Sequence, residues 1–200
     1  MMNWQELAAL LTLATATSFT PGPNTTLSTA LAANFGLKRA LRFVIAVAVG
    51  WGLLLSACAG GLGTLIVSLP MLRLTVKMIG IGYLLWLALR LSRSAQLSVV
   101  DSSRLNVSFW QGVMLQFVNI KAWMLALTVV AGWIAGTADA LQRFALVLPL
   151  MLCFGLASNF TYALAGSLLR GWLAVGTRLL MFNRLMALLL VGTAAWMLRM

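Results

Sequence analysis

The chain has 200 residues, of which 62% are hydrophobic and 8% charged, whereas soluble domains carry roughly 25% charged residues. This composition excludes a water-soluble monomer and predicts an all-α polytopic membrane protein. The net charge of +11 comes from 14 Lys and Arg against 3 Asp and Glu. Because the basic residues cluster between apolar segments, they indicate membrane orientation and contacts with anionic lipid, and nucleic-acid binding is not expected.

Six apolar segments are each long enough to cross a bilayer as a helix, which takes roughly 20 residues. They lie at about Leu7 to Asn34, Val44 to Val67, Leu74 to Leu91, Phe109 to Ile134, Phe144 to Leu169 and Leu179 to Leu198. Barrel strands are excluded because these runs far exceed the roughly 10 residues of a transmembrane strand. The longest polar stretch, about Ser92 to Ser108, is too short to bury a core of its own, so residues 1–200 are expected to form a single membrane domain.

The first predicted span contains the sequence Pro21-Gly22-Pro23. Each proline removes a backbone donor, so the carbonyls of Thr17 and Phe19 lose their helical partners and the helix is expected to break. A second half-helix should begin near Pro23, with the first amides pointing into the break. The residues that supply these amides are Asn24, Thr25 and Thr26.

Such a break suits both ends of an amino-acid zwitterion, because the amides attract a carboxylate and the freed carbonyls attract an ammonium group. The alternative is a packing kink in which the hydroxyls of Thr17, Ser18 and Thr20 satisfy the backbone.

Lys121 is the basic residue deepest inside a predicted span, roughly 18 Å from its edge at 1.5 Å per residue. No acidic residue of a neighbouring span is available to pair with it, so a substrate carboxylate is a candidate partner. Alternatively, the lysine snorkels or hydrogen-bonds to Asn119 and to backbone carbonyls. Asn159, within the fifth span, either lines a cavity or hydrogen-bonds between helices.

Basic residues on the side of the loops that follow the odd-numbered spans outnumber those on the other side nine to four. The nine are Lys38, Arg39, Arg42, Arg90, Arg93, Arg104, Arg170, Arg178 and Arg184, and the four are Arg73, Lys77, Arg143 and Arg199. Because cytoplasmic loops carry the excess of positive charge, the loop containing Asp101 should be cytoplasmic and both termini periplasmic.

Three spans before the polar stretch and three after it suggest two repeats, about 1–95 and 105–200. Since three is an odd number, the repeats would insert in opposite directions. A polar interruption after a phenylalanine occurs in the first span of each half, after Phe19 and after Phe117. The sequence thus predicts two inverted three-helix repeats.

The chain has no histidine, and Cys58 and Cys153 fall inside apolar spans, where both are expected to be buried. Neither a metal site nor a cofactor is therefore expected. A membrane enzyme is disfavoured, because the three acidic residues lie at span ends or in loops. The spacing of Gly132 and Gly136 allows close helix packing within one chain or in a homo-oligomer.

Several motifs resemble the LysE/RhtB family of amino-acid exporters along essentially the whole chain. They are Pro21-Gly22-Pro23, Gly36-Leu37-Lys38-Arg39-Ala40, Gly50, Gly80-Ile81-Gly82-Tyr83-Leu84-Leu85-Trp86-Leu87, and Asn183 with Leu190 and Gly192. Three others look most similar to the branch that exports cysteine and O-acetylserine: Thr20-Pro21-Gly22-Pro23-Asn24, Leu115-Gln116-Phe117-Val118-Asn119-Ile120-Lys121, and Tyr162-Ala163-Leu164-Ala165-Gly166.

The resemblance implies a transporter domain in the bacterial inner membrane that exports small neutral amino acids, driven by the proton gradient. A channel or a structural membrane protein is the alternative. The expected substrate-binding residues are Thr17, Phe19, Pro21, Gly22, Pro23, Asn24, Thr25, Asn119, Lys121 and Asn159. Two departures matter: many members have Asn-Pro-Lys where this chain has Asn119-Ile120-Lys121, and many have an aspartate in span five that is missing here. Without the proline, the sequence does not decide whether the fourth span is broken as well, although Asn119 and Lys121 remain available. Without the aspartate, no acidic residue of span five can be assigned a proton-carrying or cation-binding role.

Overall fold

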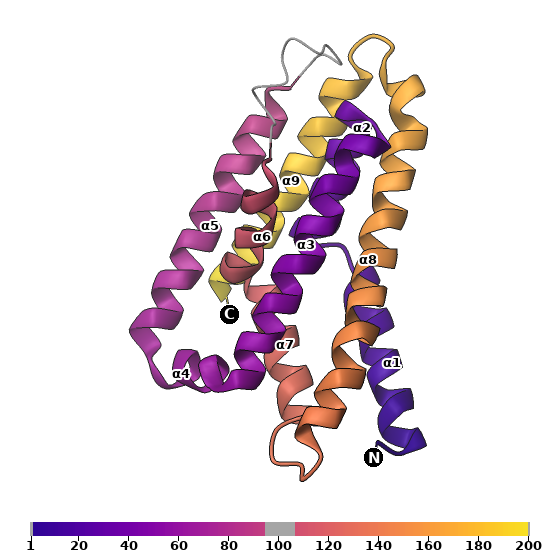
Figure 1. Ribbon diagram of the computed structural model, residues 1–200. Coiled ribbons are helices and arrows are strands. Elements are labelled where there is room, and N and C mark those ends of the chain that lie inside the picture. Colours follow the sequence, from indigo (N-terminus) through magenta and orange to yellow (C-terminus); the bar gives the residue numbers. More distant parts are fainter. Residues whose placement is uncertain (1, 95–106, 200) are drawn as a thin grey trace.

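In a computed structural model, the backbone is described for residues 2–94 and 107–199, and the side chains for the same residues except 65–67. All regular elements in this part of the chain are helical, which confirms the predicted all-α class (Figure 1). They are α1 Trp4–Phe19, α2 Pro23–Phe35, α3 Leu37–Ala57, a π-helical turn at Cys58–Leu62, α4 Gly63–Ser68, α5 Pro70–Ser92, α6 Phe109–Val118, α7 Ile120–Trp133, α8 Ala140–Leu173 and α9 Arg178–Arg199.

Helix starts follow local capping chemistry. Asn3 and Glu6 form a reciprocal capping box at the start of α1, with both side-chain to main-chain hydrogen bonds at 2.8 Å. Ser108 and Gln111 form the same arrangement at α6. Pro70 occupies the first turn of α5, where its missing N–H costs nothing. Short polar segments of the sequence thus define where apolar helices begin.

Four helical segments are long and apolar enough to cross a membrane: Leu37–Leu62, Pro70–Ser92, Ala140–Leu173 and Arg178–Arg199. The pair α6 and α7 passes the same test as one span bent by 66°. The pair α1 and α2 does not, and its helices have 16 and 13 residues. Length and composition therefore support a polytopic membrane protein with four or five spans, while the sixth span stays a prediction.

The second predicted span, Val44 to Val67, differs from the observed helix. Helix α3 begins earlier, at Leu37, and ends in the π-helical turn, after which α4 runs sideways toward the start of α5 (Figure 1). Gly61 in this turn has φ 103°, a left-handed conformation that glycine adopts without steric cost. The apolar run continues through the bend, so hydrophobicity alone did not locate it.

The most extensive helix contacts join the two halves of the chain: α2 packs on α8, α3 on α6 and α5 on α9. Gly166 of α8 lies directly against α2, where a Cβ would overlap the main-chain carbonyl oxygen of Thr29. Small residues permit such close backbone approach, which drives helix packing in a membrane, where burial of apolar surface contributes little. The two halves therefore form one interlocked bundle.

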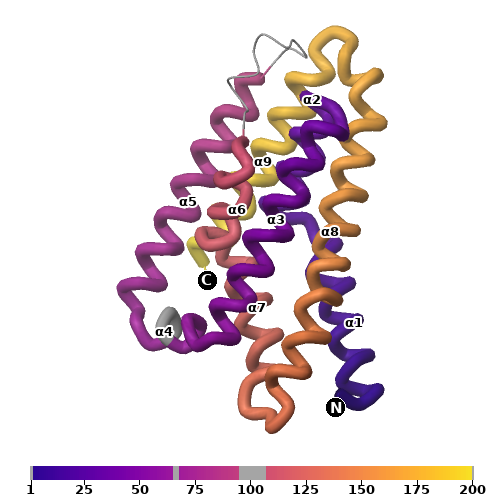
Figure 2. The backbone as a smooth tube through the Cα atoms, in the orientation of Figure 1, coloured from indigo at the N-terminus to yellow at the C-terminus, as the bar shows by residue number. Residues whose placement is uncertain are grey.

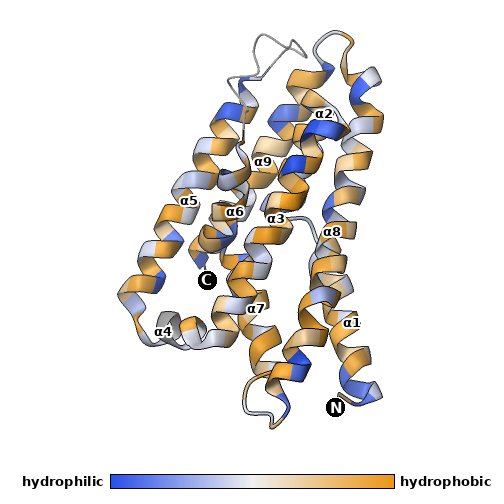
Figure 3. Cartoon of the chain, in the orientation of Figure 1, coloured by the Kyte–Doolittle hydropathy of each residue, from blue (hydrophilic) through white to orange (hydrophobic). Residues whose placement is uncertain are grey.

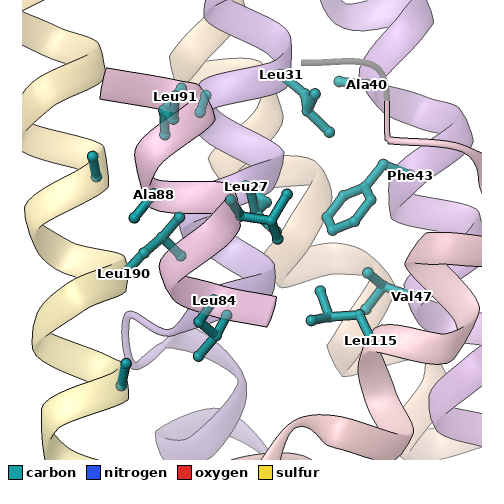
Figure 4. Packing of buried hydrophobic residues seen from close by; sticks show 14 of the residues in the cluster. Leu27, Leu31, Ala40, Phe43, Val47, Leu84, Ala88, Leu91, Leu115 and Leu190 are labelled. Carbon is teal, nitrogen blue, oxygen red and sulfur yellow. The ribbon is translucent and has the colours of Figure 1, made fainter. Parts of the chain in front are cut away.

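The two larger of three hydrophobic clusters lie along this bundle. One joins α2, α3, α5, α6, α8 and α9 and includes Leu27, Phe43, Leu84, Leu115 and Leu190 (Figure 4). The other joins α1, α3, α7 and α8 and contains Trp51, Trp123 and Met151. Helices α3 and α8 contribute to both clusters, and the polar residues described below lie where the clusters meet.

Hydrophilic residues gather near the end of the molecule where α2 meets α3 (Figure 3). There the amides of Asn34 and Asn183 exchange two hydrogen bonds of 2.8 and 3.0 Å, and Asn183 also donates to the carbonyl of Ser94 at 2.9 Å. These hydrogen bonds join the end of α2, the end of α5 and the start of α9. The starts of α3 and α9 and the end of α5 lie at this end of the bundle (Figure 1), as expected if the three odd-numbered loops share one side.

At the opposite end, Arg143 of α8 donates to the Glu6 carboxylate at 3.0 Å and to Asp139 at 2.8 Å. The indole of Trp133 donates to the main-chain carbonyl of Glu6 at 2.8 Å. Hydrogen bonds from Arg143 hold the pKa of Glu6 below its ordinary range. This cluster ties the start of α1 to α7 and α8.

One sequence expectation lies outside the described residues, and another needs correction. The boundary between the predicted repeats, and with it Asp101 and Arg104, lies outside the described residues. Cys58 is buried as expected, but Cys153 is exposed on the outer face of α8. An apolar run does not by itself distinguish a helix face that meets protein from one that meets lipid.

Candidate substrate site

The predicted break in the first span is present, and side chains from other helices donate hydrogen bonds to its main-chain carbonyls. Helix α1 ends at Phe19 and α2 begins at Pro23 (Figure 2). The carbonyl of Phe19 accepts a hydrogen bond from the Tyr162 hydroxyl at 2.9 Å, and that of Thr20 accepts one from Lys121 Nζ at 2.8 Å. The prolines thus create carbonyl acceptors that residues of α8 and α7 satisfy.

The neighbouring carbonyl of Ser18 accepts a hydrogen bond from Ser158 Oγ at 2.5 Å. Two nearby threonine hydroxyls bond carbonyls one turn earlier: Thr17 donates to that of Leu13 at 2.6 Å, and Thr20 donates to that of Ala16 at 2.5 Å. Local hydroxyls therefore satisfy carbonyls in the last turns of α1, as in the alternative, while the carbonyls of Ser18, Phe19 and Thr20 accept from other helices.

Two hydrogen bonds of Gly22 stabilise the first turn of α2. The Gly22 amide donates to Thr25 Oγ1 at 2.9 Å, and the Thr26 amide donates to the Gly22 carbonyl at 2.9 Å. The Thr26 amide is thus used inside the helix, which corrects the expectation that it faces the break. The amides of Asn24 and Thr25 precede the first intrahelical bond and have no helical acceptor.

A second break separates α6 from α7 at Asn119, although the residue that follows is isoleucine and not proline (Figure 2). The Asn119 side chain caps α7 by accepting from the Lys121 amide at 3.2 Å. The indole of Trp123 donates to the carbonyl of Phe117, at the end of α6, at 2.8 Å. An asparagine cap and an indole donor therefore support the break without a proline.

The two breaks are in direct contact. Asn24 and Gln116 exchange amide hydrogen bonds of 2.8 and 3.1 Å, and Gln116 is fully buried. The side chain of Lys121 crosses Gly22 so closely that a Cβ there would lie 3.3 Å from Lys121 Cδ and 3.4 Å from Nζ. Glycine therefore permits the lysine to reach the Thr20 carbonyl.

A cavity of about 80 Å³ lies between the breaks, at the junction of the two hydrophobic clusters. This is room for a few water molecules, at roughly 10–15 Å³ each. Eight of the ten predicted binding residues line it: Thr17, Gly22, Pro23, Asn24, Thr25, Asn119, Lys121 and Asn159. Phe19 and Pro21 do not, because their part in the break lies in the backbone.

Asn159 also forms one hydrogen bond to another helix, as its alternative role requires, and one within α8. Its Oδ1 accepts from Ser28 at 3.1 Å, and its Nδ2 donates to the carbonyl of Gly155 at 2.9 Å. Thus one residue both lines the cavity and joins α8 to α2.

Other residues of the site were not singled out as binding residues from the sequence. The cavity is also lined by Thr20 and by Trp51, whose buried indole nitrogen has no hydrogen-bond partner among the described residues. Tyr162 and Gln116 each lie in a motif that carried the family resemblance, and this was the signal that could have identified them. Nothing in the local pattern around Trp51 distinguished it from a packing residue.

Positively charged groups and main-chain acceptors both border the cavity. The N-terminal turns of α2 and α7 both border it, and Lys121 adds a full charge, while none of the described acidic side chains lines it. The carbonyl of Thr20, which follows the C-terminal end of α1, lies beside them and accepts from Lys121 at 2.8 Å. Helix N-termini favour anions, so the arrangement suits a small solute that carries a carboxylate and an ammonium group.

A cavity bordered by two broken membrane helices, whose helix ends face it with main-chain groups that lack helical partners, is typical of a secondary transporter. The family model described as LysE type translocator matches residues 15–200, and the chain belongs to this family. It is a membrane transporter and not an enzyme.

Three curated relatives are each named cysteine/O-acetylserine efflux protein. Those of Klebsiella pneumoniae and Salmonella choleraesuis are both 31% identical to this chain, and that of Escherichia coli strain K12 is 30% identical. The alignments cover 94% of this chain and 94 to 95% of each relative. No solved structure matches. The Gram-negative hosts and the apolar helices indicate a multi-pass protein of the inner membrane.

Proposed function

We propose that the protein exports small neutral amino acids of the cysteine or O-acetylserine type from the cytoplasm. The names of its relatives support the substrate class. The observation that carries the proposal is the cavity in which helix N-termini, helix C-terminal carbonyls and Lys121 converge without an acidic side chain. A dibasic amino acid would need an acidic partner for its side chain, and the cavity offers none.

In this proposal the substrate carboxylate lies at the first turn of α2, against the amides of Asn24 and Thr25 and within reach of Lys121. The ammonium group lies at the carbonyls of Thr17 and Thr20, which the proline-containing break separates from helical donors. The substrate must be small, because the side chains of Trp51 and Met151 limit the space in the cavity beside the two breaks.

We further propose that six spans form two inverted repeats, about 1–95 and 105–200, in a single transporter domain. The α1–α2 pair would then be the first span and the α6–α7 pair the fourth. The packing supports this pattern, because span one contacts span five while span four contacts span two, and span three contacts span six. Two interlocked repeats are expected to show such contacts, in which each span of one repeat packs on a span of the other. Both termini would face the periplasm.

Proton-gradient coupling is proposed with Lys121 as its centre, because it is the ionisable side chain that lines the cavity. Lys121→Met should then abolish gradient-driven export. The matched control is Lys77→Met, since Lys77 Nζ also donates to a main-chain carbonyl, that of Leu198 at 3.1 Å, but away from the cavity.

The test is uptake of radiolabelled amino acids into inverted membrane vesicles. We expect accumulation of cysteine and O-acetylserine, little of lysine or arginine, and loss of accumulation when a protonophore collapses the gradient. Equal transport of arginine would refute the substrate class. Absence of uptake of every amino acid would favour the alternative, a channel or structural membrane protein.

A further inference from the structure

We propose that Lys121 is a specificity-determining residue that makes a carboxylate obligatory, because its own ammonium group occupies the place of the substrate ammonium when the site is empty. This inference rests on the proposed function and adds a mechanism of selection to it. The structure places the Lys121 ammonium on the Thr20 carbonyl at 2.8 Å, in the break that is proposed to receive the substrate ammonium.

The Thr20 carbonyl is an acceptor because the break interrupts the helix. In a continuous helix it would accept from the amide of Asn24, four residues later. Here Asn24 lies in the first turn of a separate helix, and the lysine supplies the missing donor. A primary ammonium group is the same chemical group that an amino acid would present, so lysine and substrate compete for one acceptor.

Lys121 has no carboxylate that would hold it elsewhere. It forms no ion pair in the described part of the chain, and it is half-buried in a span. Its aliphatic chain crosses Gly22, so its ammonium lies next to the first turn of α2, where the substrate carboxylate is proposed to bind. A rotation of the side chain is therefore enough to move the charge from the carbonyl to that carboxylate.

The energetic consequence is a requirement for both substrate charges. A zwitterion displaces the lysine from Thr20 but gives it a carboxylate in return, so the charge stays paired. An amine without a carboxylate displaces the lysine and leaves its charge half-buried and unpaired, which is unfavourable. Lys121 should therefore exclude simple amines that fit the cavity.

The experiment measures binding of serine and of ethanolamine, which lacks the carboxylate, to purified protein by calorimetry. The wild type should bind serine and not ethanolamine. Lys121→Met should lose serine affinity and gain ethanolamine affinity at least about tenfold, because the charge-assisted hydrogen bond to Thr20 no longer competes. Lys77→Met should match the wild type for both ligands.

Lys121→Gln provides a second variant, in which a neutral amide can still reach the Thr20 carbonyl, and monodispersity and helical circular dichroism verify that each variant is folded. We expect a smaller gain of ethanolamine affinity in this variant. If the wild type binds serine but neither folded variant gains ethanolamine affinity, or if Lys121→Met keeps full serine affinity, the inference is wrong and the proposed function stands. If the wild type binds neither serine nor any neutral amino acid, the proposed function itself fails.

Discussion

Asn24 and Gln116 face each other with two amide hydrogen bonds, so the first turn of α2 and the end of α6 are joined although they lie 92 residues apart in sequence. Gln116 also donates to the carbonyl of Gly112 at 3.2 Å within its own helix. This pair connects the two helix breaks around the cavity, and any movement of one break must be transmitted to the other or break these bonds.

Gln116→Ala should destabilise the protein by about 1 to 3 kcal/mol, because it leaves the Asn24 amide without its partner beside the cavity. Transport should fall as well, since Asn24 would lose its orientation. Thermal unfolding in detergent measures the first effect and vesicle uptake the second. The double variant Asn24→Ala with Gln116→Ala should cost less than the sum of the single changes, whereas additive costs would show that the pair is not coupled.

Gly166→Ala should destabilise α2–α8 packing by about 1 to 3 kcal/mol, because its methyl group would overlap the Thr29 carbonyl. Gly171→Ala is the control in the same helix, since a Cβ there meets nothing within 4 Å. Alanine has the higher helix propensity, so the control should be neutral or gain up to about 1 kcal/mol. Equal unfolding temperatures of the two variants would contradict the close approach.

Pro21→Ala combined with Pro23→Ala should leave the protein inserted in the membrane but remove most transport. The change restores the amides that a continuous helix would use and so removes the break that exposes the Thr17 and Phe19 carbonyls. Expression and uptake are measured together in the same vesicles. Normal uptake by the double variant would mean that the prolines serve packing alone.

The Glu6–Arg143 ion pair should make stability depend on pH in the acid range. Because hydrogen bonds from Arg143 lower the pKa of Glu6, its contribution is fully present above the ordinary glutamate pKa of about 4.3 and is lost as pH falls through the lowered value. Unfolding in detergent between neutral pH and about pH 3 measures this loss. Glu6→Gln should show a weaker dependence on pH over that window, and an unchanged profile would exclude the ion pair as its source.

Orientation is tested with single cysteines placed in a variant that lacks Cys58 and Cys153. Thr177→Cys, between α8 and α9, should be protected from an impermeant thiol reagent in intact spheroplasts. Ala138→Cys, in the connection between α7 and α8, should react, because the basic residues gather at the other end of the bundle. Both positions lie between helices in the structure, so the reverse labelling pattern would mean that the protein is inverted relative to the prediction.

The sequence by itself determined the class of the protein, the break at Pro21-Gly22-Pro23 and the family. These follow from local properties: apolar length decides what can cross a bilayer, and proline removes a hydrogen bond wherever the chain places it. It also singled out Lys121, because an unpaired charge within an apolar span is unusual in any fold. Eight of the ten residues chosen on these grounds line one cavity.

Only the tertiary structure decided which partners meet across the bundle. That Lys121 reaches the Thr20 carbonyl, that Tyr162 satisfies Phe19 and that Gln116 pairs with Asn24 depends on helix packing, which brings together residues 92 to 143 positions apart. The break at Asn119 and the bend at Gly61 likewise depended on context, because an asparagine or a glycine within an apolar run permits a bend without requiring one. Side-chain donors from other helices stabilise the broken ends, and their positions are set by the fold and not by local sequence.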